Sequence, residues 1–370
     1  MTFDYAHRRD SLRHLLREKS LAALLVTDEL NVTYLTGFTG DSSYLVVAPD
    51  RELLITDGRY TQQLAGECSD LPLAVRLPGG SLPGFAADCL SKLALPSIGI
   101  EADNVTVGFH EKLKAALKTT QLAHTSGLVE SLREIKDAGE IVAIRKAIRI
   151  AEDAFVELRG GLKVGQTEKE IADDLEYKIR RRGGTCSAFP TIVGVGPRAA
   201  LPHGRPTIES RLGDSESVLI DWGARGPAPA AYHSDLTRVL VTGKLSPQLQ
   251  TVYGVVLAAQ RAAIAAIRPG AVMKDIDAAA RSTIEAAGYG KQFNHALGHG
   301  LGLAVHELPR LAPDQNRQLA PGMVVTVEPG IYLPGSLGVR IEDDCLVTDT
   351  GHEVLTTLPK ELEECTLSDS

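Results

Sequence analysis

Apolar positions in the first third of the chain alternate between short runs and helical spacing. Leu12, Leu15 and Leu16 recur at steps of three and one in the segment 8–19, which predicts an amphipathic helix. Short apolar runs bounded by turn residues then predict buried strands, with further helices between them. The expected strands are 21–26, 43–48, 52–56, 73–77 and 98–101, and the expected helices are 60–66, 83–93 and 109–117. This alternation predicts a mixed α/β layer.

The pattern changes near residues 127–136, where a long amphipathic helix is expected. Its apolar residues recur at alternating steps of three and four, at Ile141, Ile144, Ile148, Ala151, Phe155 and Leu158. Gly160 and Gly161 end this helix, and a capping box of Thr167 with Glu170 begins another. Further helices are expected at 246–268 and 274–287. The change predicts an amino-terminal domain at 1–130 and a carboxy-terminal domain at 131–370.

An internal repeat runs through the carboxy-terminal part. Residues 162–171 match residues 267–276 in spacing, and Pro202-His203-Gly204 is answered later by Val305-His306-Glu307. Asp221 and Glu328 follow at similar offsets. Two copies of a helix-helix-strand unit related by a pseudo-two-fold axis would each bring a histidine and strand-borne carboxylates to a shared centre, as a dinuclear site requires.

Composition narrows the class of protein. The 370 residues are too many for one ordinary core, and 44% hydrophobic with 23% charged residues is a globular composition. A net charge of −8 disfavours nucleic acid and anionic membranes as partners. Residues 1–20 lack the apolar core of a signal peptide, and no stretch is expected to span a membrane. Five scattered cysteines indicate reduced thiols. We expect a cytoplasmic protein.

Three histidines lie among glycines in the segment 293–307. They are His295, His299 and His306, and the glycines between them favour a loop or a short extended segment over a helix. An imidazole offers a nitrogen to a metal or a proton to a reacting group near neutral pH. By itself this segment is equally well explained as a glycine-rich turn with surface histidines.

Carboxylates at the ends of apolar runs favour the metal hypothesis. Residues 323–327 lead into Glu328, residues 338–341 lead into Glu342, and two aspartates, Asp221 and Asp235, flank similar runs upstream. A charge at the end of a buried strand is costly unless it is paired or binds a cation. Four carboxylates and one imidazole suit Mn, Co or Zn, and that much negative charge suits two ions better than one.

Ordered motifs along almost the whole chain resemble those of the Xaa-Pro peptidases, the prolidases and aminopeptidases P of the "pita-bread" metallopeptidase family. The amino-terminal segments that carry the resemblance are Tyr34-Leu35-Thr36-Gly37-Phe38-Thr39-Gly40 and Thr56-Asp57-Gly58-Arg59-Tyr60. The later ones are Leu201-Pro202-His203-Gly204, Ile220-Asp221-Trp222-Gly223-Ala224, Ser234-Asp235-Leu236-Thr237-Arg238, Gly298-His299-Gly300-Leu301-Gly302, Val305-His306-Glu307, Val327-Glu328-Pro329-Gly330 and Val339-Arg340-Ile341-Glu342-Asp343. The resemblance implies a creatinase/prolidase-type α/β domain followed by a pita-bread domain, and a homodimer.

The resemblance also implies the metal ligands. Asp221 would bind one divalent ion, His299 and Glu328 the other, and Asp235 and Glu342 would bridge the two. A hydroxide shared by the ions would attack the peptide carbonyl, and Glu328 or a neighbouring carboxylate would take the proton of the water and pass it to the leaving nitrogen.

The remaining site residues also follow from the family pattern. His203 and His306 are expected to donate hydrogen bonds to the substrate carbonyl and to the charge that develops on it. His295 is expected to line the proline pocket, and Tyr332 is either a substrate-site residue or a packed tyrosine. Arg340 is grouped with them, and we expect it to orient Glu342 more than to touch substrate.

The resulting hypothesis is hydrolysis of the bond between an amino-terminal residue and a following proline, in a dipeptide or a longer peptide. Methionine aminopeptidases are an alternative, although they normally lack such an amino-terminal domain. Creatinase-like enzymes and metal-free binding modules of the same fold are another, although they have lost ligands that are present here. Two departures from the family are Asp41, which has no assigned role, and an insertion at Arg225–Ala231, which is expected to form a stiff, solvent-facing turn at the rim of the cleft. The insertion is either a tolerated hairpin without effect, or it favours short peptides because Arg225 reaches the substrate's C-terminal carboxylate or narrows the cleft. Gly37-Phe38-Thr39-Gly40 lacks a phosphate-binding Lys and is expected to be a turn between strands.

Overall fold

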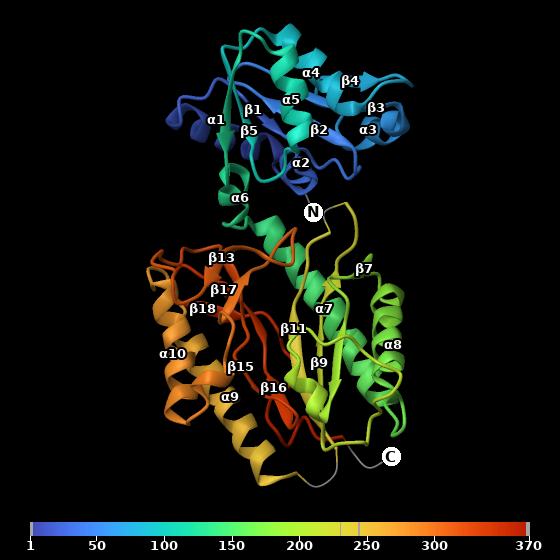
Figure 1. The fold of residues 1–370 in the computed structure, drawn as a ribbon, viewed down its shortest axis with the longest axis vertical. Coiled ribbons are helices and arrows are strands. Elements are labelled where there is room, and N and C mark those ends of the chain that lie inside the picture. The colour runs from blue at the N-terminus through green and yellow to red at the C-terminus, as the bar shows by residue number, and fades with distance from the viewer. Residues whose placement is uncertain (1–2, 230, 243–244, 368–370) are drawn as a thin grey trace. The chain divides into compact units, whose positions relative to one another are not determined.

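The computed structural model describes residues 3–229, 231–242 and 245–367 (Figure 1). The chain divides into two units, Met1–Arg133 and Glu134–Ser370. Each unit buries apolar clusters made of its own residues, which is the property of a domain.

The amino-terminal unit is built on one six-stranded sheet in the order β4-β3-β2-β1-β5-β6. Strand β2 runs antiparallel to β1 and β3, and the other pairs are parallel. The strands are β1 (Leu24–Val26), β2 (Ser43–Val47), β3 (Glu52–Asp57), β4 (Leu73–Arg76), β5 (Ser97–Glu101) and β6 (Gln121–Thr125). The mixed α/β layer predicted from the sequence is confirmed.

Helices pack against this sheet because alternate strand residues point to opposite faces. Leu25, Val46 and Ile55 form a buried cluster with Leu90 and Leu113 from two of these helices. The helical elements are α1 (Tyr5–Glu18), α2 (Glu29–Thr36), η1 (Gly58–Tyr60), α3 (Thr61–Glu67), α4 (Leu82–Leu93), α5 (Val107–Ala116) and α6 (Leu128–Arg133).

The prediction that Gly37–Gly40 connects two strands is wrong, because the segment connects a helix to a strand. It follows helix α2, and Gly37 takes φ 78° as the left-handed residue that ends the helix. Helix α2 escaped prediction because its hydrophobic residues are buried nearly all round, so they show no helical periodicity.

The carboxy-terminal unit repeats one order of elements twice, a helix pair followed by antiparallel strands. The first copy comprises α7 (Ala138–Gly161), α8 (Glu168–Arg181), β7 (Cys186–Ser187), β8 (Ile192–Val195), η2 (Gly196–Ala200), β9 (Ser217–Trp222), β10 (Ala224–Arg225) and β11 (Leu236–Val241). The second comprises α9 (Pro247–Ala266), α10 (Met273–Ala286), η3 (Gly290–Gln292), β12 (Gly298–Gly300), β13 (Glu307–Leu311), β14 (Val324–Val327), β15 (Gly330–Leu333), β16 (Leu337–Arg340), β17 (Asp343–Val347) and β18 (His352–Val354).

The strands of the two copies form the middle of this unit. One sheet has the order β11-β9-β8 and another the order β13-β12-β14-β17-β18. In Figure 1 the pair α7 and α8 flanks these strands on one side and the pair α9 and α10 on the other. The capping box of Thr167 and Glu170 is present at the start of α8, as predicted.

Helix α9 corrects one expectation from the sequence. By length and a mean hydropathy of 1.2 it could cross a membrane, although no such stretch was expected. Half of its apolar window is buried inside the protein, where Val252, Tyr253 and Val256 join the largest core cluster. Its hydrophobicity is therefore explained by the core of this unit.

Candidate metal centre

Five strands or strand ends deliver the predicted ligands to one place. Asp221 lies in β9 and Asp235 directly precedes β11, which pairs with β9 so that Asp221 is opposite Thr237. His299 is the middle residue of β12, and Glu328 directly follows β14. Glu342 stands between β16 and β17. The centre therefore lies where strands of both copies of the repeat meet.

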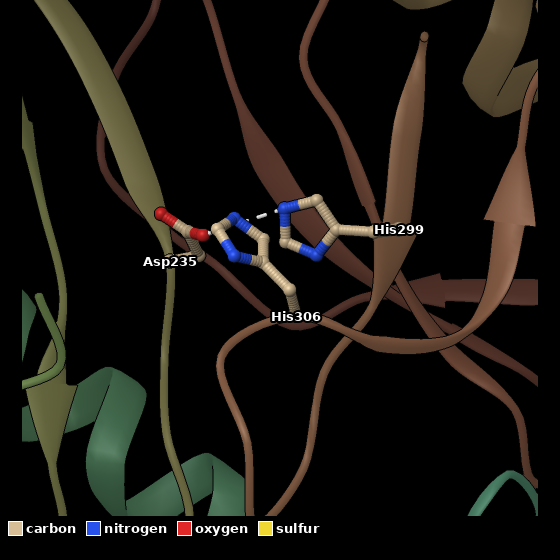
Figure 2. Close-up of side chains that lie close together, drawn as sticks. All are labelled: Asp235, His299 and His306. Carbon is tan, nitrogen blue, oxygen red and sulfur yellow. Dashed lines mark ion pairs between the residues drawn. The ribbon is translucent and has the colours of Figure 1, made fainter. Parts of the chain in front are cut away.

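Potential ligand atoms at this place form three overlapping groups, and within each group they lie within 4.8 Å of one another. The groups are Asp221 with Asp235 and Glu342, His299 with Glu328 and Glu342, and Asp235 with His299 and His306. Figure 2 shows the third group, with the two imidazoles and the Asp235 carboxylate turned toward one another. Because Asp235, His299 and Glu342 each belong to two groups, all of the predicted ligands share one continuous centre.

Burial makes the accumulated negative charge costly. Asp221, Asp235 and Glu342 expose only 7%, 4% and 1% of their surface. Burial, followed by the charge of neighbouring carboxylates, raises the pKa of Asp235 and of Glu342 well above the usual range. Burial also raises the pKa of Asp221, against the opposing charge of Arg340. Like charges this close ionise together only when a cation lies among them, so the carboxylates fit divalent metal ions.

His299 presents a free lone pair to the same place. Its Nδ1 lies 3.1 Å from the carbonyl oxygen of Gly300, which only accepts, so Nδ1 carries the proton of the neutral ring. Nε2 then faces Glu328 Oε1 at 3.2 Å and Asp235 Oδ2 at 3.7 Å. Three acceptors facing one another suit a shared cation.

When no cation lies near Nε2, a proton on His299 can stabilise the neighbouring carboxylate instead. Burial opposes it, but the hydrogen bond and charge of Glu328 raise the pKa of His299. In turn, against its own burial, the hydrogen bond and charge of His299 lower the pKa of Glu328 to about 2. A proton on His299 and a cation near its Nε2 therefore compete for the same position.

Glycines beside His299 permit the close approach of neighbouring strands. A Cβ atom at Gly298 would lie 2.0 Å from the carbonyl oxygen of Thr326, and one at Gly300 would lie 2.1 Å from that of Leu308. Any side chain at either position would displace a backbone segment. The glycine pattern around His299 therefore has a steric cause.

Arg340 contacts one predicted ligand directly and another through a threonine. Its guanidinium donates to Asp221 Oδ2, to the Tyr332 hydroxyl at 2.6 Å and to Thr237 Oγ1 at 3.1 Å. It was expected to orient Glu342, and it is linked to that carboxylate through Thr237 and by its charge. The residue that it holds directly is Asp221, which lies in β9.

A hydrogen-bonded chain joins Arg340 to His295. His295 Nδ1 faces the carbonyl oxygen of Ala296 at 2.7 Å, which leaves Nε2 to accept from the Tyr332 hydroxyl at 3.0 Å. Burial lowers the pKa of His295 and raises the pKa of Tyr332 to about 12. Tyr332 is 4% exposed and is therefore packed, which was one of the two expectations for it. It is also hydrogen-bonded to His295 and Arg340, two predicted site residues.

The other two predicted histidines are exposed at the edge of the centre. The ring of His306 meets that of His299 edge to face, with centroids 4.3 Å apart. Burial and the neighbouring charge of His299 lower the pKa of His306. His203 acts electrostatically on Asp221, whose pKa it lowers when protonated. Their exposure leaves both rings free to meet a substrate.

Two threonines escaped the sequence analysis. Thr237 Oγ1 donates to Glu342 Oε2 at 2.6 Å, and Thr326 Oγ1 donates to Glu328 Oε1 at 3.2 Å while it accepts the His299 amide at 3.0 Å. Each threonine lies in a strand two residues from a predicted ligand at the end of that strand, so the two side chains point to the same side of the sheet. This two-residue spacing from a predicted ligand could have identified both threonines from the sequence.

The insertion is less exposed than expected. Arg225 pairs with Cys186 in a short two-stranded sheet, and Ala231 is buried. Only Ala228 and Pro229 are exposed, and Ala230 lies outside the described residues. The expected solvent-facing turn is therefore confined to the tip, because backbone pairing holds both ends of the segment.

Comparisons with known proteins agree with this geometry. The family described as "Metallopeptidase family M24" matches residues 142–349, and the "Creatinase/Prolidase N-terminal domain" matches residues 8–135. An uncharacterized peptidase of Bacillus subtilis is 39% identical over 95% of this chain and 98% of its own length.

Two solved structures are similar over nearly the whole chain. The Xaa-Pro dipeptidase from Bacillus anthracis has a TM-score of 0.91 and 36% identity, covering 97% of this chain and 99% of its own. The X-Pro aminopeptidase from Thermotoga maritima has a TM-score of 0.84 and 36% identity, covering 92% of this chain and 97% of its own.

Proposed function

Because the chain belongs to metallopeptidase family M24 and carries the creatinase/prolidase amino-terminal domain, we propose that it hydrolyses the bond between an amino-terminal residue and a following proline. One observation carries the proposal. The five predicted ligands, which are scattered from Asp221 to Glu342, converge on one buried centre with the exposed His306 at its edge. The reaction is that of an Xaa-Pro dipeptidase or an Xaa-Pro aminopeptidase.

The ligand set is suited to two divalent ions. Asp221 would hold one, His299 and Glu328 the other, and Asp235 and Glu342 both. Oxygen donors with a single imidazole fit Mn, Co or Zn. When bound, such ions polarise the peptide carbonyl and acidify the attacking water.

The residues of this chain divide the remaining work. Glu328 accepts the proton of the attacking water and returns it to the proline nitrogen as the peptide bond breaks, so no proton is gained or lost. His203 and His306 donate hydrogen bonds to the carbonyl oxygen as it becomes negative. His295 and Tyr332 form one wall of the proline pocket, and Arg340 keeps Asp221 in place.

The proposal is tested by comparing peptides of equal length that begin Ala-Pro and Ala-Ala. We expect kcat/KM to be roughly 100-fold higher for the Ala-Pro peptide, because a shaped apolar pocket discriminates by a few kcal/mol. Chelation should abolish hydrolysis, and added Mn, Co or Zn should restore it. Equal values for the two peptides would instead favour a methionine-type or general aminopeptidase.

The alternatives are weaker for specific reasons. A methionine aminopeptidase has no need of the amino-terminal domain that matches residues 8–135 here. A creatinase-like or purely binding role does not call for the full set of five ligands. Activity without bound metal would favour that second class.

A second test concerns substrate length. The half-buried Arg225 has a side-chain Nε without a hydrogen-bond partner in the described part of the chain, and it acts electrostatically on His233, which contacts Gly302 near His306. We expect Arg225 to reach the carboxylate of a dipeptide substrate, so Arg225→Gln should lower dipeptide kcat/KM about tenfold relative to a pentapeptide. An unchanged ratio with normal metal content would leave the insertion without a role in specificity.

The remaining proposals concern the setting of the enzyme. We infer a cytoplasmic homodimer that binds peptides. We also infer that it binds neither nucleic acid nor membranes, because its net charge of −8 is repelled by their negative charge. Sedimentation of the purified protein measures the oligomer, and cell fractionation measures the compartment.

A further inference from the structure

A buried ion pair lies beside the turn that carries His306, and the proposed reaction does not use it. Lys136 Nζ lies 2.9 Å from Glu307 Oε1, and the two side chains are only 0% and 7% exposed. Neither residue belongs to the predicted ligand set. An isolated buried charge is costly, so each member strongly constrains the position of the other.

The Glu307 carboxylate is folded back against the turn that precedes it. Its Oε2 accepts the Ala304 amide at 3.3 Å, and within the turn the Gly302 amide donates to the Ala304 carbonyl at 3.0 Å. A Cβ atom at Gly302 would lie 2.1 Å from Glu307 Oε1. The carboxylate therefore occupies the space that a side chain at Gly302 would fill, and it fixes the shape of the turn.

Lys136 and the beginning of the turn are each held by further hydrogen bonds. The Lys136 amide donates to the carbonyl of Gly322 at 2.9 Å, and its ammonium also reaches the carbonyl of Glu134 at 3.4 Å. At the other end the His233 amide donates to the carbonyl of Gly302 at 2.9 Å. The turn from Gly302 to Glu307 is therefore held at its beginning, its middle and its end.

We propose that Lys136 and Glu307 are positioning residues that hold His306 against the metal centre. The ring of His306 is exposed and meets His299 edge to face, so its place depends on the backbone that carries it. Glu307 is the next residue, and Lys136 fixes Glu307. This inference rests on the proposed function, in which His306 stabilises charge on the substrate.

The experiment uses the full chain with Lys136→Met, Glu307→Gln and the double variant, assayed on an Ala-Pro peptide. We expect each single change to lower kcat roughly 10- to 100-fold with KM and bound metal nearly unchanged, which is typical when the support of a functional group is lost. The double variant should lose no more than the worse single one, because both remove the same contact. Unchanged kcat, or losses that multiply in the double variant, would overturn the proposal.

A matched control separates positioning from stability. Arg317 pairs with Glu134 at 2.6 Å, and that carboxylate is as buried as Glu307 and lies two residues from Lys136. Arg317→Met should lower the melting temperature as Lys136→Met does, but leave kcat within about twofold, since surface-exposed partners away from a site rarely affect chemistry. An equal loss of kcat in Arg317→Met would make the role of Lys136 purely structural.

A readout without peptidase activity keeps the inference distinct from the proposed function. Hydrogen exchange of the peptide 300–311 should rise in Glu307→Gln and in Lys136→Met, because the Ala304 amide loses a fixed acceptor. Unchanged exchange would contradict the proposal even in an active enzyme. If the wild-type chain instead cleaves no Xaa-Pro peptide, the proposed function fails, and raised exchange would still establish that the pair holds the turn.

Discussion

Replacing Glu342 by glutamine is expected to lower kcat/KM on the order of 1,000-fold or more, the larger part of it through lost metal. Glu342 belongs to two of the three groups of potential ligand atoms, so a neutral amide at this position weakens the binding of both ions. The substitution preserves the size of the side chain and can keep the hydrogen bond from Thr237. The measurements are kcat/KM on an Ala-Pro peptide and metal content per chain.

Glu152→Gln is the matched control for this prediction. Glu152 is 4% exposed, against 1% for Glu342, and its carboxylate accepts the amides of Thr357 and Leu358. Losing that charge should lower the melting temperature and leave metal content and turnover within about twofold, because the carboxylate binds two backbone amides and the Thr357 hydroxyl, all outside the predicted ligand set. Near-normal activity and full metal content in Glu342→Gln would contradict a dinuclear centre.

Arg340→Met is expected to lower kcat/KM about 100-fold. The change leaves Asp221 without the guanidinium that neutralises it and removes the donor to the Tyr332 hydroxyl, through which His295 is held. Both the metal site and the proposed proline pocket should suffer, so we expect kcat to fall and KM to rise together. Steady-state kinetics and metal titration of the purified variant measure these effects.

Arg340→Lys distinguishes geometry from charge. A lysine keeps the positive charge but cannot direct planar donors to Asp221, Tyr332 and Thr237 at once. We therefore expect the lysine variant to recover metal binding more than turnover. Recovery of full turnover would mean that charge alone matters at this position, and normal activity of Arg340→Met would remove Arg340 from the site.

Local patterns were enough to predict several features of the fold. The α8 capping box is a property of two residues three apart, and it forms as expected from Thr167 and Glu170. Strand-end carboxylates such as Glu328 could also be recognised, because a charge that ends a buried apolar run has few acceptable environments. Helix α2 could not be recognised, since it is buried almost all round and has no polar face to reveal its period.

Partners across the chain were decided only by the tertiary structure. Arg340 was expected to orient Glu342, two residues away, but nothing in the sequence indicated that its guanidinium donates to Asp221, 119 positions away. Lys136 and Glu307 show no pattern that links them, although they form one buried pair. The physical reason is that hydrophobic spacing reports which side of an element is buried, whereas the group it meets there depends on strand pairing and packing. The amino-acid sequence by itself therefore identified the candidate site residues, and the fold decided which residues contact them.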